Sequence, residues 1–520
     1  MRAIVGRLAV VALLAGAVVG VPGPAAEADR TAHRLIVKYR AGVADIADRA
    51  ARHGRVKREL AGGAVLIAGS DAVRRALAAD PDVAYVERDE LFQLAEAPND
   101  PEYGKQWNLH DPTAGMNVPG AWTSTTGAGV TVAVIDTGYT KHSDLAQVVP
   151  GYDLIADPAR ARDGNGRDGD AADEGTWTTA GQCGATGKAT ASGWHGTYVA
   201  GIVGAVANNG KGVAGVAPGI KLQPIRVFGP CGGYGSDILE GIVWASGGRV
   251  PGLPDNPTPA RVINLSAGGG GACSQAMQDA VSGAISRGAV VVNSAGNSNS
   301  DVANHSPSNC KGVISVGAST IEGNRAPYSN YGATLTITAP GGSGSGGILS
   351  TSNAGTTTPG AEVYRSGMGT SAAAPHVAGL VALMLAKRPS LTPAQVETVL
   401  KANARPMPGD CPAGCGAGLA DAAKTIKALD VPPPTITVDN PGEQWSYKGF
   451  PIAPLQLSAK ASNGAPVTFK ATGLPPGLTI TTAGRVSGTP TAAGTFTTTV
   501  TASASGGTGR VSFTWRVWGW

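Results

Sequence analysis

Short apolar runs alternate with helix-like segments through the middle of this 520-residue chain. Val130 to Ile135 and Gly288 to Val292 are mostly apolar and β-branched, which is typical of strands buried on both faces of a parallel sheet. Small and apolar residues from Ala372 to Leu385 predict a buried helix, and Leu391 to Ala404 predicts a closing helix. We therefore expect the α/β class, with a mostly parallel sheet and helices on both faces.

The residues after Pro432-Pro433-Pro434, a stiff linker, follow a different pattern. They are rich in Thr and Val, alternate in polarity and are interrupted by Gly and Pro turns, which predicts an antiparallel all-β sandwich. Its last strand, Val511 to Val517, carries apolar residues on one face, so we expect that face in the core. Trp518 and Trp520 fall outside this alternation and are candidates for contact with a partner, which we expect to be a surface or a polymer.

The amino end predicts export. Arg2 and Arg7 precede the apolar run Leu8 to Val21, and Ala26-Glu27-Ala28 offers a small-x-small cleavage site, as in a secretory signal. The run is too short to span a membrane, and we expect no other span. A net charge of +4 without a basic run argues against nucleic acid as a partner. We expect a secreted, extracellular monomer.

Three polar residues stand where a catalytic site needs them. Asp136 ends the first apolar strand, His195 begins a helix rich in Gly and Ala, and Ser371 begins the buried helix. A serine hydroxyl becomes a strong nucleophile when an imidazole takes its proton, and the imidazole needs an anion to orient it. Each residue alone has an ordinary structural explanation, such as a helix cap or a turn.

Together these segments resemble the subtilase family of serine peptidases. Its three blocks match Asp136-Thr137-Gly138, His195-Gly196-Thr197 and Gly369-Thr370-Ser371 with Pro375-His376, in that order. The resemblance implies a subtilisin-like fold and hydrolysis of peptide bonds through an acyl-enzyme. Two positions depart from the pattern, since Tyr198 replaces a common second His and Ala372 a common Met.

The resemblance also implies the remaining site residues. It places the oxyanion-hole amide at Asn297, although composition alone leaves Asn293 open. An extended substrate would add as a strand to the edge formed by Ser266, Ala267 and Gly268. The segment containing Gly233 would form the opposite edge.

Calcium is the cofactor that the sequence suggests. The loop from Asp163 to Glu174 concentrates carboxylates and glycines, which suit an ion with six to eight oxygen ligands. The predicted ligands are Asp163, Asp168, Asp170 and Asp173, with a second site at Asp144 beside the 208–212 loop that rests on the resemblance. A solvated acidic loop is the alternative.

Six cysteines suit an exported protein with disulfides. Sequence alone permits fifteen pairings, and zinc is a weak rival at the last two cysteines. Resemblance to bacterial subtilases favours Cys183 with Cys231, Cys273 with Cys310, and Cys411 with Cys415.

The sequence and its resemblances predict four parts. They are a signal peptide (1–28), a small α/β segment that resembles the family's inhibitory propeptide (29–97), a subtilisin-like catalytic domain (98–430) and a β-sandwich that resembles immunoglobulin-like modules (431–520). The predicted function is a secreted serine endopeptidase, which the chain's own propeptide inhibits before maturation. An alternative is a catalytically idle subtilase scaffold that acts as an adhesive protein, and an esterase with the same triad is a third. The complete set of Asp136, His195, Ser371 and Asn297 argues against the idle scaffold.

Overall fold

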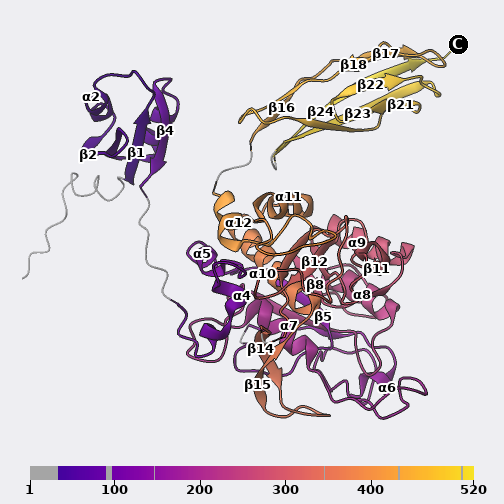
Figure 1. Cartoon of the computed structure of the whole chain (residues 1–520). Coiled ribbons are helices and arrows are strands. Elements are labelled where there is room, and N and C mark those ends of the chain that lie inside the picture. The colour runs from indigo at the N-terminus through magenta and orange to yellow at the C-terminus, as the bar shows by residue number, and fades with distance from the viewer. Residues whose placement is uncertain are drawn as a thin grey trace, which may run out of the picture. The chain divides into compact units, whose positions relative to one another are not determined.

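The computed structural model describes residues 33–89, 97–145, 147–344, 346–430, 434–504 and 507–519 (Figure 1). The chain divides into two compact units, one ending at Leu94 and the other beginning at Ala95. The predicted signal peptide, residues 431–433 with the first two linker prolines, and Trp520 lie outside the described residues.

The first unit is a four-stranded antiparallel sheet with two helices. The strand order is β2-β3-β1-β4, and buried Leu35, Val37, Ile67 and Leu77 belong to its core. β2 is a largely exposed edge strand with charged residues at most positions. The elements are β1 (His33–Tyr39), α2 (Ile46–Ala51), β2 (Arg55–Leu60), β3 (Ala64–Gly69), α3 (Asp71–Ala78) and β4 (Val83–Arg88).

The second unit is built on a seven-stranded sheet with the order β13-β12-β10-β8-β5-β7-β6, in which every pairing is parallel. This order places β5 between β8 and β7, so the strand that ends at Asp136 is internal. The strands are β5 (Thr131–Asp136), β6 (Tyr152–Asp153), β7 (Lys221–Arg226), β8 (Val262–Leu265), β10 (Val290–Ser294), β12 (Ile314–Ser319) and β13 (Ile337–Pro340).

Alternate residues of the sheet enter two different cores. Val132 and Val134 of β5 pack with the helices α7 (His195–Gly204) and α10 (Thr370–Lys387). Ala133 and Ile135 pack with α8 (Gly235–Ala245) and α9 (Gln275–Ser286) on the opposite face. Burial on both faces explains why these strands read as continuous apolar runs, and it confirms the predicted fold class.

Smaller elements complete this domain. β14 and β15 form an antiparallel hairpin, and β9 pairs with β11. These elements are α4 (Trp107–His110), α5 (Val118–Trp122), α6 (Pro158–Ala161), β9 (Gly269–Gly270), β11 (His305–Ser306), β14 (Ile348–Asn353), β15 (Glu362–Gly367), α11 (Pro393–Asn403) and α12 (Ala422–Ala428), with 3-10 turns at Tyr103–Lys105 and Val302–Asn304.

Helix α10 is the central helix of the domain. Among the described residues it alone has the length and composition of a membrane-spanning helix, yet most of it is buried in the protein core. Its side chains pack on the sheet and on α7. The apolar character of α10 is therefore that of a core helix.

The last part of the chain, from residue 434, is an all-β module with its own core around Phe469, Val486, Phe513 and Trp515. Its main sheet has the order β17-β24-β23-β20. The prediction of an antiparallel sandwich needs one correction, because β17 pairs with β24 in parallel. The strands are β16 (Ile436–Val438), β17 (Gln444–Tyr447), β18 (Leu455–Gln456), β19 (Ala459–Ala461), β20 (Thr468–Thr472), β21 (Leu478–Ile480), β22 (Arg485–Gly488), β23 (Gly494–Ala504) and β24 (Gly507–Trp518).

Candidate active site

Asp136 lies at the carboxyl end of β5 and is 1% exposed. Its Oδ1 accepts a hydrogen bond of 2.8 Å from the backbone N–H of Thr137. The two carboxylate oxygens lie 2.8 and 2.9 Å from Nδ1 of His195. A buried carboxylate held in this way fixes the orientation of the imidazole and its Nδ1–H tautomer.

His195 is the first residue of α7, and its side chain is 37% exposed. Burial of the ring lowers its pKa, but the charge and hydrogen bond of Asp136, together with the charge of Asp173, outweigh burial and raise the pKa above its usual value. The imidazole is therefore a stronger base than a free histidine.

Ser371 is the second residue of α10, immediately after Gly369 and Thr370. Gly369 has a φ of 149°, a conformation that favours glycine. A Cβ at this glycine would lie 2.9 Å from Ser371 Oγ and 3.5 Å from Asn297 Nδ2. The absent side chain leaves a small space that both polar groups border.

Asn297 follows β10 on an exposed segment. Its Oδ1 accepts hydrogen bonds from the backbone N–H and the hydroxyl of Thr370, at 2.8 and 2.9 Å. With Oδ1 occupied, the Nδ2 amide is the end of the side chain turned to the Ser371 side of Gly369. Thr370 was not singled out in the sequence, although it lies within the serine motif.

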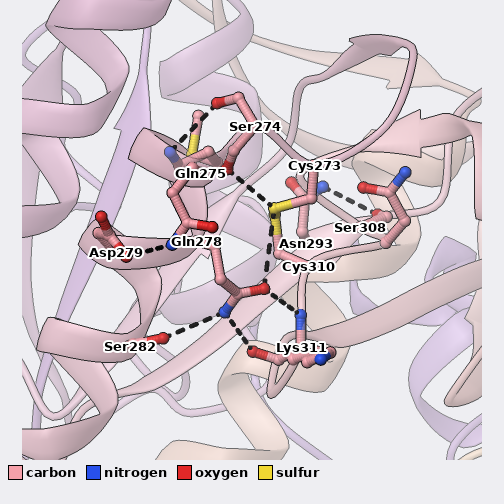
Figure 2. The surroundings of a disulfide bond; sticks show 12 residues. Cys273, Ser274, Gln275, Gln278, Asp279, Ser282, Asn293, Ser308, Cys310 and Lys311 are labelled. Carbon is pink, nitrogen blue, oxygen red and sulfur yellow. Dashed lines mark hydrogen bonds between the residues drawn. A yellow bond between two sulfur atoms is a disulfide. The ribbon is translucent and has the colours of Figure 1, made fainter.

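Asn293, the competing candidate, has another environment. It lies within β10, is 0% exposed, and its Nδ2 donates to the Ser308 hydroxyl at 2.8 Å. Figure 2 shows this bond beside the Cys273–Cys310 disulfide. A side chain committed to the interior in this way does not reach a substrate, so the geometry favours Asn297.

The predicted substrate-binding residues follow two strands of the sheet. Ser266 comes after β8, and its hydroxyl donates to the carbonyl of Ser371 at 3.0 Å. Ala267 is half-buried and Gly268 is exposed, so backbone is accessible along this edge. Gly233 lies on the segment after β7, where a Cβ would come within 2.5 Å of the Val227 carbonyl oxygen.

The four proposed catalytic residues thus come from the carboxyl ends of β5 and β10 and from the amino ends of two helices that pack on each other, α7 and α10. This edge is where open parallel sheets place their sites. His376, one turn after Ser371, takes no part. It is 0% exposed and accepts from Asn108 Nδ2 at 2.8 Å while its Nδ1–H donates to the Ala372 carbonyl.

The five predicted calcium ligands are not brought together. Among the residues that the structure describes, no three His, Cys, Asp or Glu side chains could hold a common ion. Asp144 is 0% exposed and accepts from Asn209 Nδ2 at 2.7 Å and from the Val213 N–H at 3.0 Å. It does lie beside the 208–212 loop, as expected, but it meets donors there.

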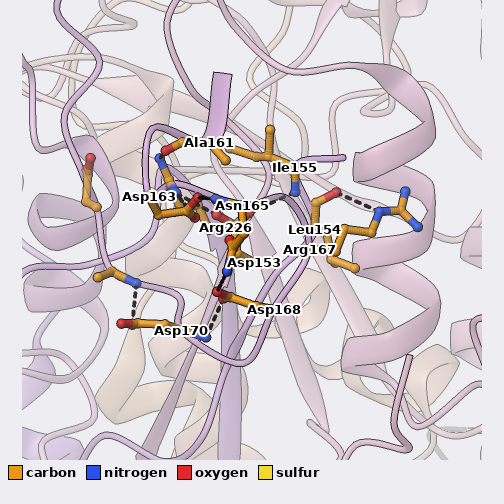
Figure 3. Close-up of polar contacts among 12 residues, drawn as sticks. Asp153, Leu154, Ile155, Ala161, Asp163, Asn165, Arg167, Asp168, Asp170 and Arg226 are labelled. Atoms are coloured by element: carbon orange, nitrogen blue, oxygen red, sulfur yellow. Dashed lines mark hydrogen bonds and ion pairs between the residues drawn. The ribbon is translucent and has the colours of Figure 1, made fainter. Parts of the chain in front are cut away.

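The guanidinium of Arg226 lies against Asp163, the first carboxylate of the acidic loop. The buried Arg226 guanidinium lies 2.5 Å from Asp153 and 3.3 Å from Asp163 (Figure 3). Asp168 accepts from Asn165 Nδ2 and from the Asp170 N–H, both at 2.8 Å. The carboxylates as arranged therefore do not fit a shared calcium ion, because arginine and N–H donors already satisfy them.

Three disulfides are formed, in the pairs that the resemblance implied: Cys183–Cys231, Cys273–Cys310 and Cys411–Cys415. The Cys183–Cys231 disulfide connects the segment between Asp136 and His195 to the segment that carries Gly233. The second connects the residues after β9 to those after β11. Covalent links therefore restrain both loops beside the proposed substrate edges.

Most of the chain is similar to known proteins. A model of the subtilase family matches residues 127–425, and a model of an Ig domain matches residues 433–518. The chain is 53% identical over 363 residues to an extracellular protease of Xanthomonas campestris pv. campestris, covering 69% of this chain and 62% of that protein. It is 44% identical over 363 residues to an extracellular basic protease of Dichelobacter nodosus, covering 68% of this chain and 59% of that one.

The chain therefore spans less than two thirds of the length of these two relatives. Among solved structures it resembles proteases from Pseudoalteromonas arctica with a TM-score of 0.63 and 50% identity, covering 64% of this chain and all of that one (100%).

Proposed function

The chain belongs to the subtilase family, and from that premise we propose that it is a secreted serine endopeptidase that hydrolyses peptide bonds through an acyl-enzyme. The observation that carries the proposal is the contact of His195 Nδ1 with both oxygens of buried Asp136. A bond of this kind prepares the imidazole to act as a base. An adhesive protein without catalysis has no need of it.

In the proposed mechanism, Nε2 of His195 takes the proton of the Ser371 hydroxyl as Oγ attacks the substrate carbonyl. Asp136 stabilises the imidazolium that forms, and His195 then returns the proton to the leaving amine. Water repeats the sequence on the acyl-enzyme and releases the new carboxyl group. Ser371 is regenerated at the end of the cycle.

The negative oxygen of the tetrahedral intermediate needs donors that are already in place. We assign this role to Nδ2 of Asn297 and to the backbone N–H of Ser371. Thr370 supports the assignment, because its two hydrogen bonds hold the Asn297 carbonyl oxygen and so present the amide end. The amino end of the 18-residue helix α10 adds a favourable positive potential.

Secretion and self-inhibition are part of the same proposal. The relatives are named extracellular proteases, and residues 1–28 have the composition of a signal peptide. The first unit, whose sheet and core are its own, is proposed to be the propeptide that blocks the site until it is cleaved.

Calcium is no part of this mechanism. The sequence suggests a structural calcium ion, but among the described residues no three His, Cys, Asp or Glu side chains could hold one. If an ion stabilises this protein, chelation will shorten its half-life at elevated temperature. We expect Asp168→Ala with Asp170→Ala to leave bound calcium unchanged, because these side chains bond to their own turns. If metal analysis shows that this double variant has lost one equivalent of calcium, the ion binds at this loop.

The carboxyl-terminal module is proposed to bind a surface or polymeric substrate. Trp518, singled out in the sequence, ends β24 and is 52% exposed. Trp445 and Tyr447 of the neighbouring strand are 60% and 52% exposed. The parallel register pairs Trp445 with Arg516 and Tyr447 with Trp518, so these side chains share the outer face of the sheet.

The direct test of the proposed function is labelling with a serine-directed phosphonylating inhibitor, followed by intact-mass analysis of the secreted protein. We expect one adduct per molecule, located on the peptide that carries Ser371, and a mass that shows loss of the amino-terminal unit. A protein that is secreted, folded and unlabelled would support the idle scaffold.

A further inference from the structure

Asp173 belongs by sequence to the acidic loop, but it is the one carboxylate of that loop buried next to the proposed catalytic residues. It is 1% exposed. Its Oδ1 accepts from the Gly175 N–H at 2.9 Å, and its Oδ2 accepts from the Thr137 hydroxyl at 2.6 Å. Asp173 therefore touches the residue that follows Asp136.

Thr137 connects the two catalytic segments. Its backbone N–H donates to Asp136 Oδ1 at 2.8 Å. Its hydroxyl, while donating to Asp173, accepts from the N–H of Gly196 at 3.0 Å. Gly196 follows His195, so the Thr137 hydroxyl bonds to the backbone beside the proposed base. The backbone N–H of the same threonine bonds to the Asp136 carboxylate. Asp173 decides which way that hydroxyl points.

The backbone around this connection is closely packed. The Asp173 N–H donates to the Tyr139 carbonyl at 2.9 Å. A Cβ at Gly138 would lie 2.5 Å from the Ala171 carbonyl oxygen, and one at Gly196 would lie 1.9 Å from the Gly138 carbonyl oxygen. The three segments are therefore closely packed, and we expect a change at Asp173 to affect the positions of Asp136 and His195.

Asp173 also brings a second negative charge near the imidazole. The charged groups that act on Asp173 are Arg226, which favours its ionised form, and Asp136, which opposes it. Burial is the larger effect and raises its pKa to about 6. The charge of Asp173 acts in the same direction as that of Asp136 and raises the pKa of His195.

We propose that Asp173 is a positioning residue for the Asp136–His195 pair, which it orients through the Thr137 hydroxyl, and that its charge stabilises the imidazolium formed during the reaction. The inference rests on the proposed function. It adds a second carboxylate, outside the triad, on which the strength of the base depends.

The test is the pH dependence of kcat/KM for a short peptide substrate, measured on the mature secreted enzyme. Asp173→Asn removes the charge and keeps the size. We expect the acidic limb, which reports protonation of free His195, to move to lower pH by about 0.3 to 1 unit. We expect kcat to fall about 10-fold, with KM changed less than about twofold, because the geometry of the pair is disturbed.

Asp170→Asn is the matched control. It is the same substitution in the same loop, but Asp170 is exposed and bonds to the Ala172 N–H. Its profile should superimpose on that of the wild type. A purely structural role of Asp173 predicts a lower melting temperature with an unmoved acidic limb, and this result would overturn the proposal.

If Asp173→Asn is not recovered as folded enzyme, the hydroxyl is tested instead. Thr137→Val should lower kcat about 10-fold, and Thr137→Ser should restore it, because Ser retains the donor to Asp173. Wild-type kinetics in Thr137→Val would overturn the proposal. An inactive wild type, measured first in the same assay, would overturn the proposed function itself.

Discussion

The carboxyl edge of the seven-stranded sheet and the β17–β24 face of the last module use side chains in opposite ways. At the sheet edge, Asp136 and Thr370 are each 1% exposed and hydrogen-bonded to other site residues. On the β17–β24 face, Trp445 and Trp518 are 60% and 52% exposed. Soluble monomers rarely leave large apolar patches uncovered without a use for them.

We propose from this difference that chemistry and location are separate tasks in this protein. The sheet edge has its geometry fixed by contacts inside the catalytic domain, so it should act without help. The β17–β24 face leaves its tryptophans largely exposed, and we propose that it acts by holding the enzyme close to a surface. The predictions below test this separation, beginning with the largest expected effect.

Ser371→Ala should abolish peptide hydrolysis, because it removes the nucleophile while the rest of the site stays in place. We expect a loss of at least about 10⁴-fold. The propeptide should also remain attached, since the same serine is proposed to cut the precursor. Activity on a chromogenic peptide and intact mass measure the two effects. Normal processing in a host without other proteases would contradict self-cleavage.

Asn297→Ala should retain the fold and lower kcat by about 10² to 10³, the typical cost of losing an oxyanion donor. Substrate affinity should change little, because the donor acts on the transition state. Asn293→Ala is the comparison, since it loses a buried hydrogen bond to Ser308 and should lower the melting temperature instead. The reverse pattern would assign the oxyanion hole to Asn293.

The stability of the folded domain should also be sensitive to acid through His376, which is buried within α10. Burial lowers the pKa of this ring to about 4, although its bond to the Ala372 carbonyl opposes the shift. The unfolded chain takes up the proton below about 6.5, whereas the folded chain does not. Stability is therefore lost as the pH falls from about 6.5 toward 4, by at most ~3 kcal/mol.

Urea unfolding at several pH values, in the Ser371→Ala background that prevents self-digestion, measures this loss. His376→Gln, which cannot titrate, should flatten the dependence between pH 6.5 and 4. An equally steep dependence in this variant would place the acid sensitivity elsewhere.

The smallest expected effect is that of removing the last module. A chain ending at Asp430 should keep kcat/KM on short peptides within about twofold, because all proposed catalytic residues precede that position. It should lose activity on insoluble protein. Trp445→Ala with Trp518→Ala in the full chain should reproduce that loss, and Lys460→Ala, a charge change on β19, serves as a control. Failure of the truncated chain to mature would show that the module assists folding.

Much of this protein follows from local sequence. The β-branched runs predict the internal strands because both faces of a parallel sheet are apolar, and the buried helix after Ser371 follows from small residues. The resemblance added Asn297 and the cysteine pairs. Strand β2 could not be predicted in this way, because a charged edge strand does not show the periodicity of a core strand.

Only the tertiary structure decided which carboxylates of the acidic loop are buried and which are exposed. Asp170 and Asp173 are three positions apart and look alike in sequence, yet one is exposed and the other is buried against Thr137. Likewise, Asn293 and Asn297 flank the end of one strand, and only their partners, Ser308 and Thr370, distinguish them. The parallel pairing of β17 with β24 joins segments from opposite ends of the module. The physical reason is the same in each case: periodicity and propensity are local properties, whereas burial and hydrogen-bond partners depend on segments distant in the chain.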